Sequence, residues 1–162
     1  SKQGEVLMAG ESPTIKVALK GAKIAVISAQ WHREICDALV SGATRAIMEA
    51  GAECTVDYVA GSFELPMAAQ FALDGGADAA VVLGVVVRGE TPHFDYVCQG
   101  VTNGVMTVSL DRNKPIGFGV LTVDTVDQAI ARSGVAGSKE DKGYDAAIAA
   151  LDLLRLKRAK SS

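Results

Sequence analysis

Short apolar runs alternate with longer amphipathic stretches along most of the chain. The runs cover residues 24–28, 54–59, 79–87 and 115–121 and are rich in β-branched side chains. Runs of this length and composition predict buried strands. Between and after them, apolar positions recur at helical spacing near residues 33–50, 63–75, 94–111, 125–133 and 141–158. The pattern therefore predicts four strands, each followed by a helix, and one further helix at the end.

This strand–helix repetition predicts an α/β fold. Strands that are apolar throughout are typical of a parallel sheet covered on both faces, and right-handed crossovers then place helices in two outer layers. We expect a three-layer αβα sandwich around a four-stranded parallel sheet. Without an internal repeat or a second domain signal, residues 23–158 are expected to form one domain, followed by a short tail at 159–162.

The first 22 residues have a different pattern. They mix Gly, Ser, Pro and Lys with scattered apolar positions, as expected for an extended arm. Within the arm, Ile15, Val17 and Leu19 alternate with Lys16, Ala18 and Lys20, which is a strand pattern. An isolated strand must pair with a sheet edge of its own or a neighbouring chain. The arm is therefore a pointer to contacts between subunits.

Composition and charge exclude several classes of protein. Of 162 residues, 49% are hydrophobic and 22% charged, which excludes a disordered tail protein. A net charge of −3 argues against a nucleic-acid partner. The longest apolar run is too short to span a membrane, and no leader pattern is evident, so we expect a cytoplasmic protein. Cys36, Cys54 and Cys98 lack zinc or disulfide spacing.

Unusual residues follow the predicted strands. In doubly wound folds, ligands bind at the carboxyl ends of parallel strands. The only tryptophan, Trp31, follows the first run, Phe63 follows the second, and His93 and Phe94 follow the third. Aromatic residues make up only 5% of the chain, so their concentration at one sheet edge indicates a binding site.

The third junction combines features of an anion site and a proton-transfer site. Thr91 and Pro92 predict an N-cap and a first helical residue, whose free amides attract anions. Arg88 and His93 flank this helix start, and an exposed imidazole can transfer protons near neutral pH. The alternative is that Thr91 and Pro92 simply begin a helix and His93 satisfies its first turn.

The second junction allows two interpretations as well. Ser62 resembles an N-cap, and Pro66 is tolerated near a helix start. Phe63 is then either a hydrophobic staple or a ring that stacks on a planar ligand opposite Trp31. In the third strand, Gly84 indicates a close approach of another element, and Cys98 on the following helix is expected in the core.

Arg132 lies about ten residues beyond the fourth strand. A helix from about Thr125 would carry it roughly 12–15 Å away from the carboxyl edge of its own sheet. Arg132 then either serves a site on an adjacent subunit, where its guanidinium would suit a phosphate, or favourably ends a helix.

Three segments resemble the lumazine synthase family. They are residues 61–66 (Gly-Ser-Phe-Glu-Leu-Pro), the uninterrupted block 83–98 and residues 118–122 (Phe-Gly-Val-Leu-Thr). The resemblance runs from about Lys23 to Leu156 and implies a flavodoxin-like sheet. It also implies condensation of 5-amino-6-(D-ribitylamino)uracil with 3,4-dihydroxy-2-butanone 4-phosphate. The products would be 6,7-dimethyl-8-ribityllumazine, phosphate and water, in the penultimate step of riboflavin biosynthesis.

The resemblance implies roles for individual residues. Trp31 would stack on the pyrimidine ring, where the family more often has Phe, and His93 would transfer protons. The next subunit would contribute Phe118 and the phosphate-binding Arg132, with Lys142 as a second basic residue near the phosphate. The remaining substrate contacts would come from Ser62, Phe63 and Glu64 (ring and ribityl chain), Val85, Val86 and Val87 (pyrimidine edge), and Glu90 and Thr91 (phosphate-side turn).

The resemblance further implies a homopentamer that needs neither a cofactor nor a metal. Pentamers of this family can assemble into hollow capsids of sixty subunits, and the sequence leaves open which assembly forms. Riboflavin synthase is a candidate partner. Two alternatives to an enzyme use the same features: a non-catalytic flavin- or lumazine-binding module, and a capsid scaffold.

Overall fold

A computed structural model describes residues 18–161 of the chain. Four strands alternate with helices, in the order that the apolar pattern predicts. The elements are β1 (Lys23–Ala29), α1 (Arg33–Glu49), β2 (Glu53–Val59), the short 3-10 helix η1 (Ser62–Glu64), α2 (Leu65–Asp74), β3 (Ala79–Val87), α3 (His93–Arg112), β4 (Ile116–Val123), α4 (Val126–Ile130) and α5 (Lys142–Ser161).

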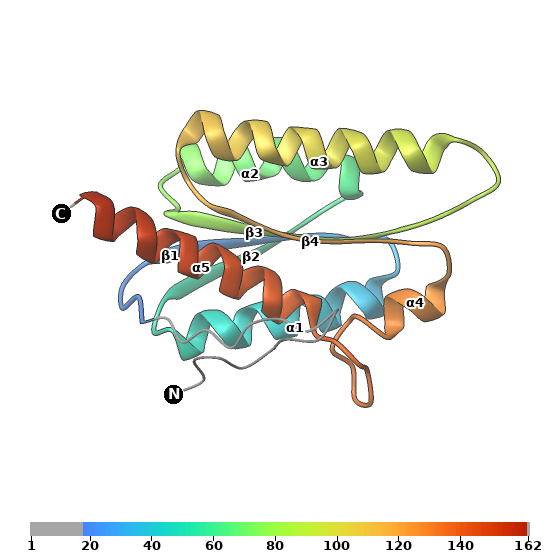
Figure 1. The fold of residues 1–162 in the computed structure, drawn as a ribbon, viewed down its shortest axis with the longest axis horizontal. Helices are drawn as coiled ribbons and strands as arrows, with labels where there is room; N and C mark the ends of the chain where they lie inside the picture. The colour runs from blue at the N-terminus through green and yellow to red at the C-terminus, as the bar shows by residue number, and fades with distance from the viewer. Residues whose placement is uncertain (1–17, 162) are drawn as a thin grey trace, which may run out of the picture.

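The four strands form one parallel sheet in the order β2-β1-β3-β4. Helices α2 and α3 cover one face, and α1 and α5 cover the other (Figure 1). The predicted three-layer sandwich is confirmed. Strand order reverses between β1 and β3, because β1 connects through α1 to β2 on one side and β3 lies on the other. This reversal opens a crevice at the carboxyl edge of the sheet.

Alternate residues of the central strands divide the core into two halves. Ile24 and Val26 of β1 pack toward α1 and α5, whereas Ala25 and Ile27 pack toward α2 and α3. Strand β3 alternates in the same way, with Val81 on the first side. Side chains of a strand point alternately to its two faces, and these strands carry apolar residues at both sets of positions. Each face of the sheet therefore bears one apolar half of the core.

The outer strand β2 differs from the prediction that every strand is covered on both faces. Glu53, Thr55, Val56 and Asp57 are exposed. The physical reason is that β2 lies at the sheet edge, where the helices packed on β1 and β3 cover it only in part. Its apolar run was therefore wrongly interpreted as a fully buried strand.

Two helical predictions also need correction. The segment expected as a helix over 125–133 is helical only at Val126–Ile130, where Thr125 caps it through a reciprocal pair of contacts with Gln128. Arg132 consequently lies in a turn after α4 rather than on a helix. The last helix, α5, runs to Ser161, beyond the predicted end at 158.

The N-terminal arm falls mostly outside the described part of the chain. Ile15 and Val17, which carry its strand pattern, lie among residues 1–17. Leu19 is buried in the core, and its backbone N–H donates to the carbonyl of Ala50 at the end of α1, at 2.8 Å. This contact fixes the start of the domain against α1.

Candidate active site

A cleft of about 680 Å³ opens at the carboxyl edge of the sheet, at the point where the strand order reverses. It gathers residues from three of the four strand–helix junctions. Its lining is Trp31, His32, Gly61, Ser62, Phe63, Glu64, Val85, Val86, Val87, Gly89, Thr91, His93, Phe94, Tyr96 and Val97. The volume suits one or two small molecules.

Trp31 stands at the cleft directly after β1. One edge of its ring lies against Gly61, where a Cβ would come within 3.3 Å of Cδ1 and Nε1, so the absence of a side chain at Gly61 leaves room for the indole. The carbonyl of Trp31 accepts from the Cys36 thiol at 3.2 Å, and His32 turns the chain into α1 with a left-handed φ of 55°. The indole itself is 68% exposed.

Phe63 faces the same cleft from η1. Its ring lies against helix α3 at Gly100, where a Cβ would be 2.8 Å from Cε1. One turn further along α3, Gly104 similarly makes room for Pro66. Phe63 remains 64% exposed although one edge is supported. Two large aromatic rings that are exposed yet held in place can stack on a flat ligand.

Ser62 does not have its predicted role as a helix cap. It lies inside η1, whose N-cap is Gly61, and α2 begins only at Leu65, with Pro66 in its first turn. The Ser62 side chain is buried, and its Oγ lacks a hydrogen-bond partner, alone among buried side-chain oxygens and nitrogens of residues 18–161. A Cβ on Gly84 would be 2.5 Å from this Oγ, so the predicted close approach at Gly84 is confirmed.

His93 is the first residue of α3 and is exposed at the cleft. The helix begins one residue later than the cap pattern predicts, with Pro92 rather than Thr91 at the N-cap, because Pro92 has a ψ of 0° and is not yet helical. As a result, no side chain caps α3, and its first amides are open to an acceptor. His93, Tyr96 and Val97 follow helical spacing and share the face that lines the cleft.

Arg88 turns away from the cleft. Its Nε donates to Asp124 at 2.8 Å, and its guanidinium lies 4.4 Å from the centre of the Phe94 ring. A second carboxylate, that of Asp95, lies 3.6 Å away. The hydrogen bond with Asp124 raises the pKa of Arg88 above its ordinary value. Arg88 therefore flanks the start of α3, as predicted, but its guanidinium is held by Asp124 and Asp95 and does not line the cleft.

The other predicted substrate contacts divide into two groups. Glu64 and Val85 to Val87 line the cleft, together with Thr91, whereas Glu90 does not, although its neighbours Gly89 and Thr91 do. Phe118, Arg132 and Lys142 also lie outside the lining. Phe118 is on edge strand β4 and is 40% exposed. This separation agrees with the expectation that Phe118 and Arg132 do not serve the cleft of their own chain.

Arg132 and Lys142 lie together at the two ends of one loop. The Lys142 N–H donates to the Arg132 carbonyl at 2.9 Å. The Glu140 carboxylate forms ion pairs with both cations: its Oε1 is 3.0 Å from Lys142 Nζ and its Oε2 is 3.7 Å from Arg132 Nε. Two cations therefore meet in a cluster separate from the cleft.

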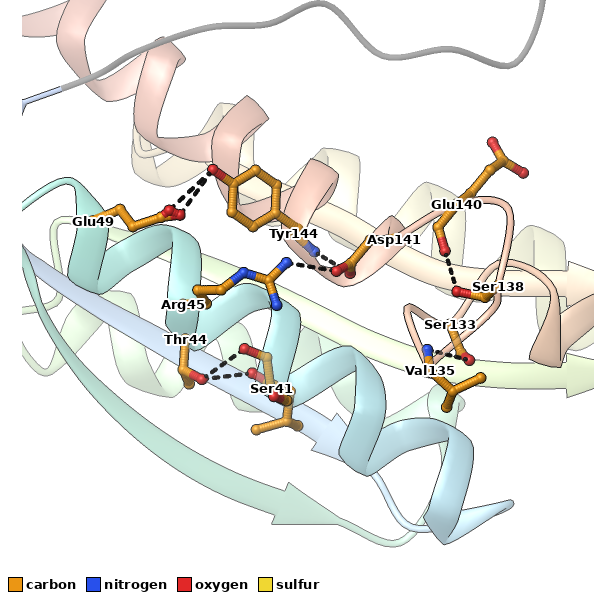
Figure 2. Close-up of polar contacts among 11 residues, drawn as sticks. Ser41, Thr44, Arg45, Glu49, Ser133, Val135, Ser138, Glu140, Asp141 and Tyr144 are labelled. Carbon is orange, nitrogen blue, oxygen red and sulfur yellow. Dashed lines mark hydrogen bonds and ion pairs between the residues drawn. The ribbon is translucent and has the colours of Figure 1, made fainter.

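Asp141 fastens this loop to α1 (Figure 2). Its Oδ2 accepts from Arg45 at 2.7 Å and its Oδ1 accepts from the N–H of Tyr144 at 3.1 Å, which caps α5. The Tyr144 hydroxyl in turn donates to Glu49 at 3.1 Å. Gly42 and Gly134 leave the space that the Asp141 carboxylate occupies. The loop that carries both cations thus has a fixed position.

Cysteine chemistry has no support in this site. All three cysteines are free thiols. Burial raises the pKa of Cys98, the charge of Asp95 raises it further, and the thiol therefore stays protonated at neutral pH. Cys98 is only half-buried, so the prediction of a core position is right in direction but too strong.

Within residues 18–161, no group of three metal-ligating side chains comes together, and the helices there lack the length and apolarity for crossing a bilayer.

Sequence reasoning singled out only part of the lining. His32, Gly61, Gly89, Tyr96 and Val97 were not among the predicted site residues, and Phe94 was noted only as part of the aromatic concentration at this edge. The signal for Tyr96 and Val97 was available, because they follow His93 by three and four positions on one helix. The glycines carry no side-chain chemistry and depend on close packing that only the structure shows.

Comparisons with known proteins point to one family. Residues 21–158 match the sequence model of the family described as 6,7-dimethyl-8-ribityllumazine synthase. Proteins with that name include one from Streptomyces avermitilis, 56% identical over 80% of this chain and 81% of its own length. Another, from Kineococcus radiotolerans, is 51% identical over 90% of this chain and 91% of its own. A third, from Paenarthrobacter aurescens, is 58% identical over 80% of each chain.

Proposed function

Because the chain belongs to the 6,7-dimethyl-8-ribityllumazine synthase family, we propose that it catalyses the condensation for which the family is named. The substrates are 5-amino-6-(D-ribitylamino)uracil and 3,4-dihydroxy-2-butanone 4-phosphate. The reaction releases phosphate and water and forms 6,7-dimethyl-8-ribityllumazine. This makes the protein a transferase of riboflavin biosynthesis.

One observation carries the proposal: two exposed aromatic rings and one exposed imidazole line a single cleft. Trp31 and Phe63 enter it from different junctions, and His93 lies at the start of α3. The pyrimidine stacks on Trp31, its edge meets the end of β3 at Val85 to Val87, and the ribityl chain extends toward Ser62 and Glu64. Ser62 and Glu64 both line the cleft at this end.

His93 supplies proton transfer in this proposal. Imine formation, loss of phosphate and ring closure each move protons, yet none needs a redox step or a protein nucleophile. An exposed imidazole can donate and accept these protons near neutral pH. Much of the rate then comes from holding two substrates in a reactive orientation.

The departing phosphate is stabilised by groups from two chains. No side chain caps α3, and its first residues line the cleft beside Thr91, so the free amides of this helix start favour an anion there. Arg132 and Lys142 lie outside the cleft of their own chain, and we assign them to the site of the adjacent subunit, together with Phe118. A guanidinium and an ammonium there offset the charge that develops on the leaving group.

The proposal requires an oligomer. We assign the chain to a cytoplasmic homopentamer, whose mass would be about 84 kDa, five times 16.8 kDa, as light scattering can measure. Assembly of pentamers into a capsid of sixty and contact with riboflavin synthase are further proposals by family resemblance. Exposed apolar side chains on α2 and α3, Met67, Phe71, Met106 and Leu110, favour association.

The test is to mix the purified protein with both substrates and follow lumazine absorbance. Product that accumulates in proportion to protein concentration supports the proposal. The matched control is Asp111→Asn, an exposed residue at the far end of α3, which should leave turnover unchanged. Tight binding of the pyrimidine or of lumazine without turnover would instead identify a carrier.

A further inference from the structure

The loop cluster already holds an anion between its two cations. Glu140 places one carboxylate oxygen at Lys142 and the other at Arg132. Its side chain is 21% exposed, less than the 34% of Lys142 and the 41% of Arg132. A carboxylate that offers two oxygens to two different cations has the same contacts that two oxygens of a phosphate monoester would make.

The net charge of the cluster determines how strongly it attracts a phosphate. Asp145 adds a second carboxylate, 3.9 Å from Lys142 Nζ. With Arg132, Lys142, Glu140 and Asp145 all ionised, the cluster has no net charge. A phosphate group carries about −1.5 to −2 charges near neutral pH, and a neutral cluster attracts it only weakly. Binding therefore favours departure of a carboxylate, and Glu140 is the one in contact with both cations.

The backbone keeps Glu140 at this place. The N–H groups of Lys139 and Glu140 both donate to the Ala131 carbonyl, at 3.0 and 3.1 Å. On the C-terminal side, Asp141 is fastened by Arg45. Arg132 is positioned as well, because its NH1 donates to the Gln128 carbonyl at 2.8 Å. The loop backbone and Arg132 are held by contacts that do not involve the Glu140 carboxylate, so both stay in place when this side chain moves.

We propose that the Glu140 carboxylate competes with the substrate phosphate for Arg132 and Lys142, and so sets the affinity of this subsite for phosphate. This inference rests on the proposed function, in which these two cations bind the phosphate of the second substrate. When phosphate binds, the carboxylate moves toward solvent. When phosphate leaves, the carboxylate returns to both cations. The competition weakens inhibition by the phosphate that the reaction releases.

The experiment measures binding of inorganic phosphate to the full-length protein by titration calorimetry in a phosphate-free buffer. Glu140→Gln removes the charge and keeps the size of the side chain. We expect it to bind phosphate about two- to fivefold more tightly, the range typical of removing partly exposed ion pairs. Asp111→Asn removes the same charge at the far end of α3 and should leave phosphate affinity unchanged. The KM for the phosphorylated substrate should fall with the phosphate dissociation constant.

The Arg132→Ala variant distinguishes a failure of this inference from a failure of the proposed phosphate role of the cluster. If Arg132→Ala weakens phosphate binding but Glu140→Gln leaves it unchanged or weaker, the cations bind phosphate and Glu140 is no competitor, which overturns this inference alone. If Arg132→Ala leaves phosphate binding unchanged, the phosphate role of the cluster is overturned, and the inference with it. Glu140→Ala serves as a second variant, since it keeps the backbone contacts of the loop, and it too should tighten binding.

Discussion

At the residue scale, the chemistry depends on a few side chains that are exposed but held in place. Trp31 lies against Gly61 and Phe63 against Gly100. In each pair the glycine lets one edge of the ring pack closely against the fold, so the ring loses little freedom when a ligand stacks on it. Affinity for a flat heterocycle thus depends also on two glycines that offer it no side chain.

His93→Ala should lower kcat by about ten- to a hundredfold, at or below the low end of general acid–base effects. The residual activity reflects orientation of the two substrates, which the substitution leaves intact. Steady-state rates at saturating substrate check this. An unchanged kcat would remove proton transfer from the role of His93.

Arg132→Ala should act mainly on one substrate. The KM for the phosphorylated substrate should rise by about ten- to a hundredfold, because a charge-assisted contact is lost. The KM for the pyrimidine should stay within about twofold, as measured by varying each substrate in turn. A rise confined to the pyrimidine KM would contradict the assignment of Arg132 to phosphate.

Some residue-level features could be predicted from the sequence and others could not. Trp31, Phe63 and His93 follow predicted strands, and the topology of a parallel sheet brings such positions together. The direction of Arg88 could not be predicted, because its choice of Asp124 over an anion depends on how close β3 and β4 end. The contact between Glu140 and Arg132 could not be predicted either, since it depends on how one loop turns.

At the scale of elements, close helix packing positions the loop that carries the two cations. Gly143 in the first turn of α5 sits against the backbone of Leu39 in α1, so closely that a Cβ there would overlap the Leu39 carbonyl. The Asp141 cap and the Arg45 contact lie immediately beside this crossing. Packing of α5 on α1 therefore also fixes Lys142.

Gly143→Ala should destabilise the protein by about 1–3 kcal/mol, the usual cost of overpacking. Alanine favours a helix by up to about 1 kcal/mol over glycine, but the clash is with backbone and outweighs that gain. Urea unfolding at matched protein concentration measures the difference. Gly89→Ala is the control, because nothing lies within 4 Å of a Cβ there. Equal midpoints for the two variants would contradict the packing argument.

The boundaries of the strands and helices show where the hydrophobic pattern alone was enough to place an element. Strand β3 has its predicted bounds because all its residues are apolar and mostly buried. The helix starts were less accurate: Ser62 and Thr91 resemble caps, yet η1 and Pro92 occupy those turns. A side chain that could cap a helix does not by itself fix where the helix begins. In both cases the backbone conformation determined the first helical residue. Edge strand β2 shows that an apolar run does not determine its place in the sheet.

At the scale of the whole molecule, the proposed site is divided between two surfaces of one chain. The cleft holds the aromatic rings and His93, while Arg132 and Lys142 lie in a separate cluster. A head-to-tail ring is the arrangement in which every cleft meets the neighbour's cluster. The division also means that a chain damaged at one surface can still support its neighbour through the other.

The most direct test of this account is complementation between His93→Ala and Arg132→Ala chains that are co-expressed with different tags and purified through both. If Arg132 serves the adjacent site, random mixing should restore wild-type kcat/KM in about a quarter of the sites, because each of the two positions is intact with a probability of about one half. Wild-type chains mixed with the double variant should also give about a quarter. No recovery in the first mixture, with about half of the sites active in the second, would show that both residues act within one chain and would contradict the account.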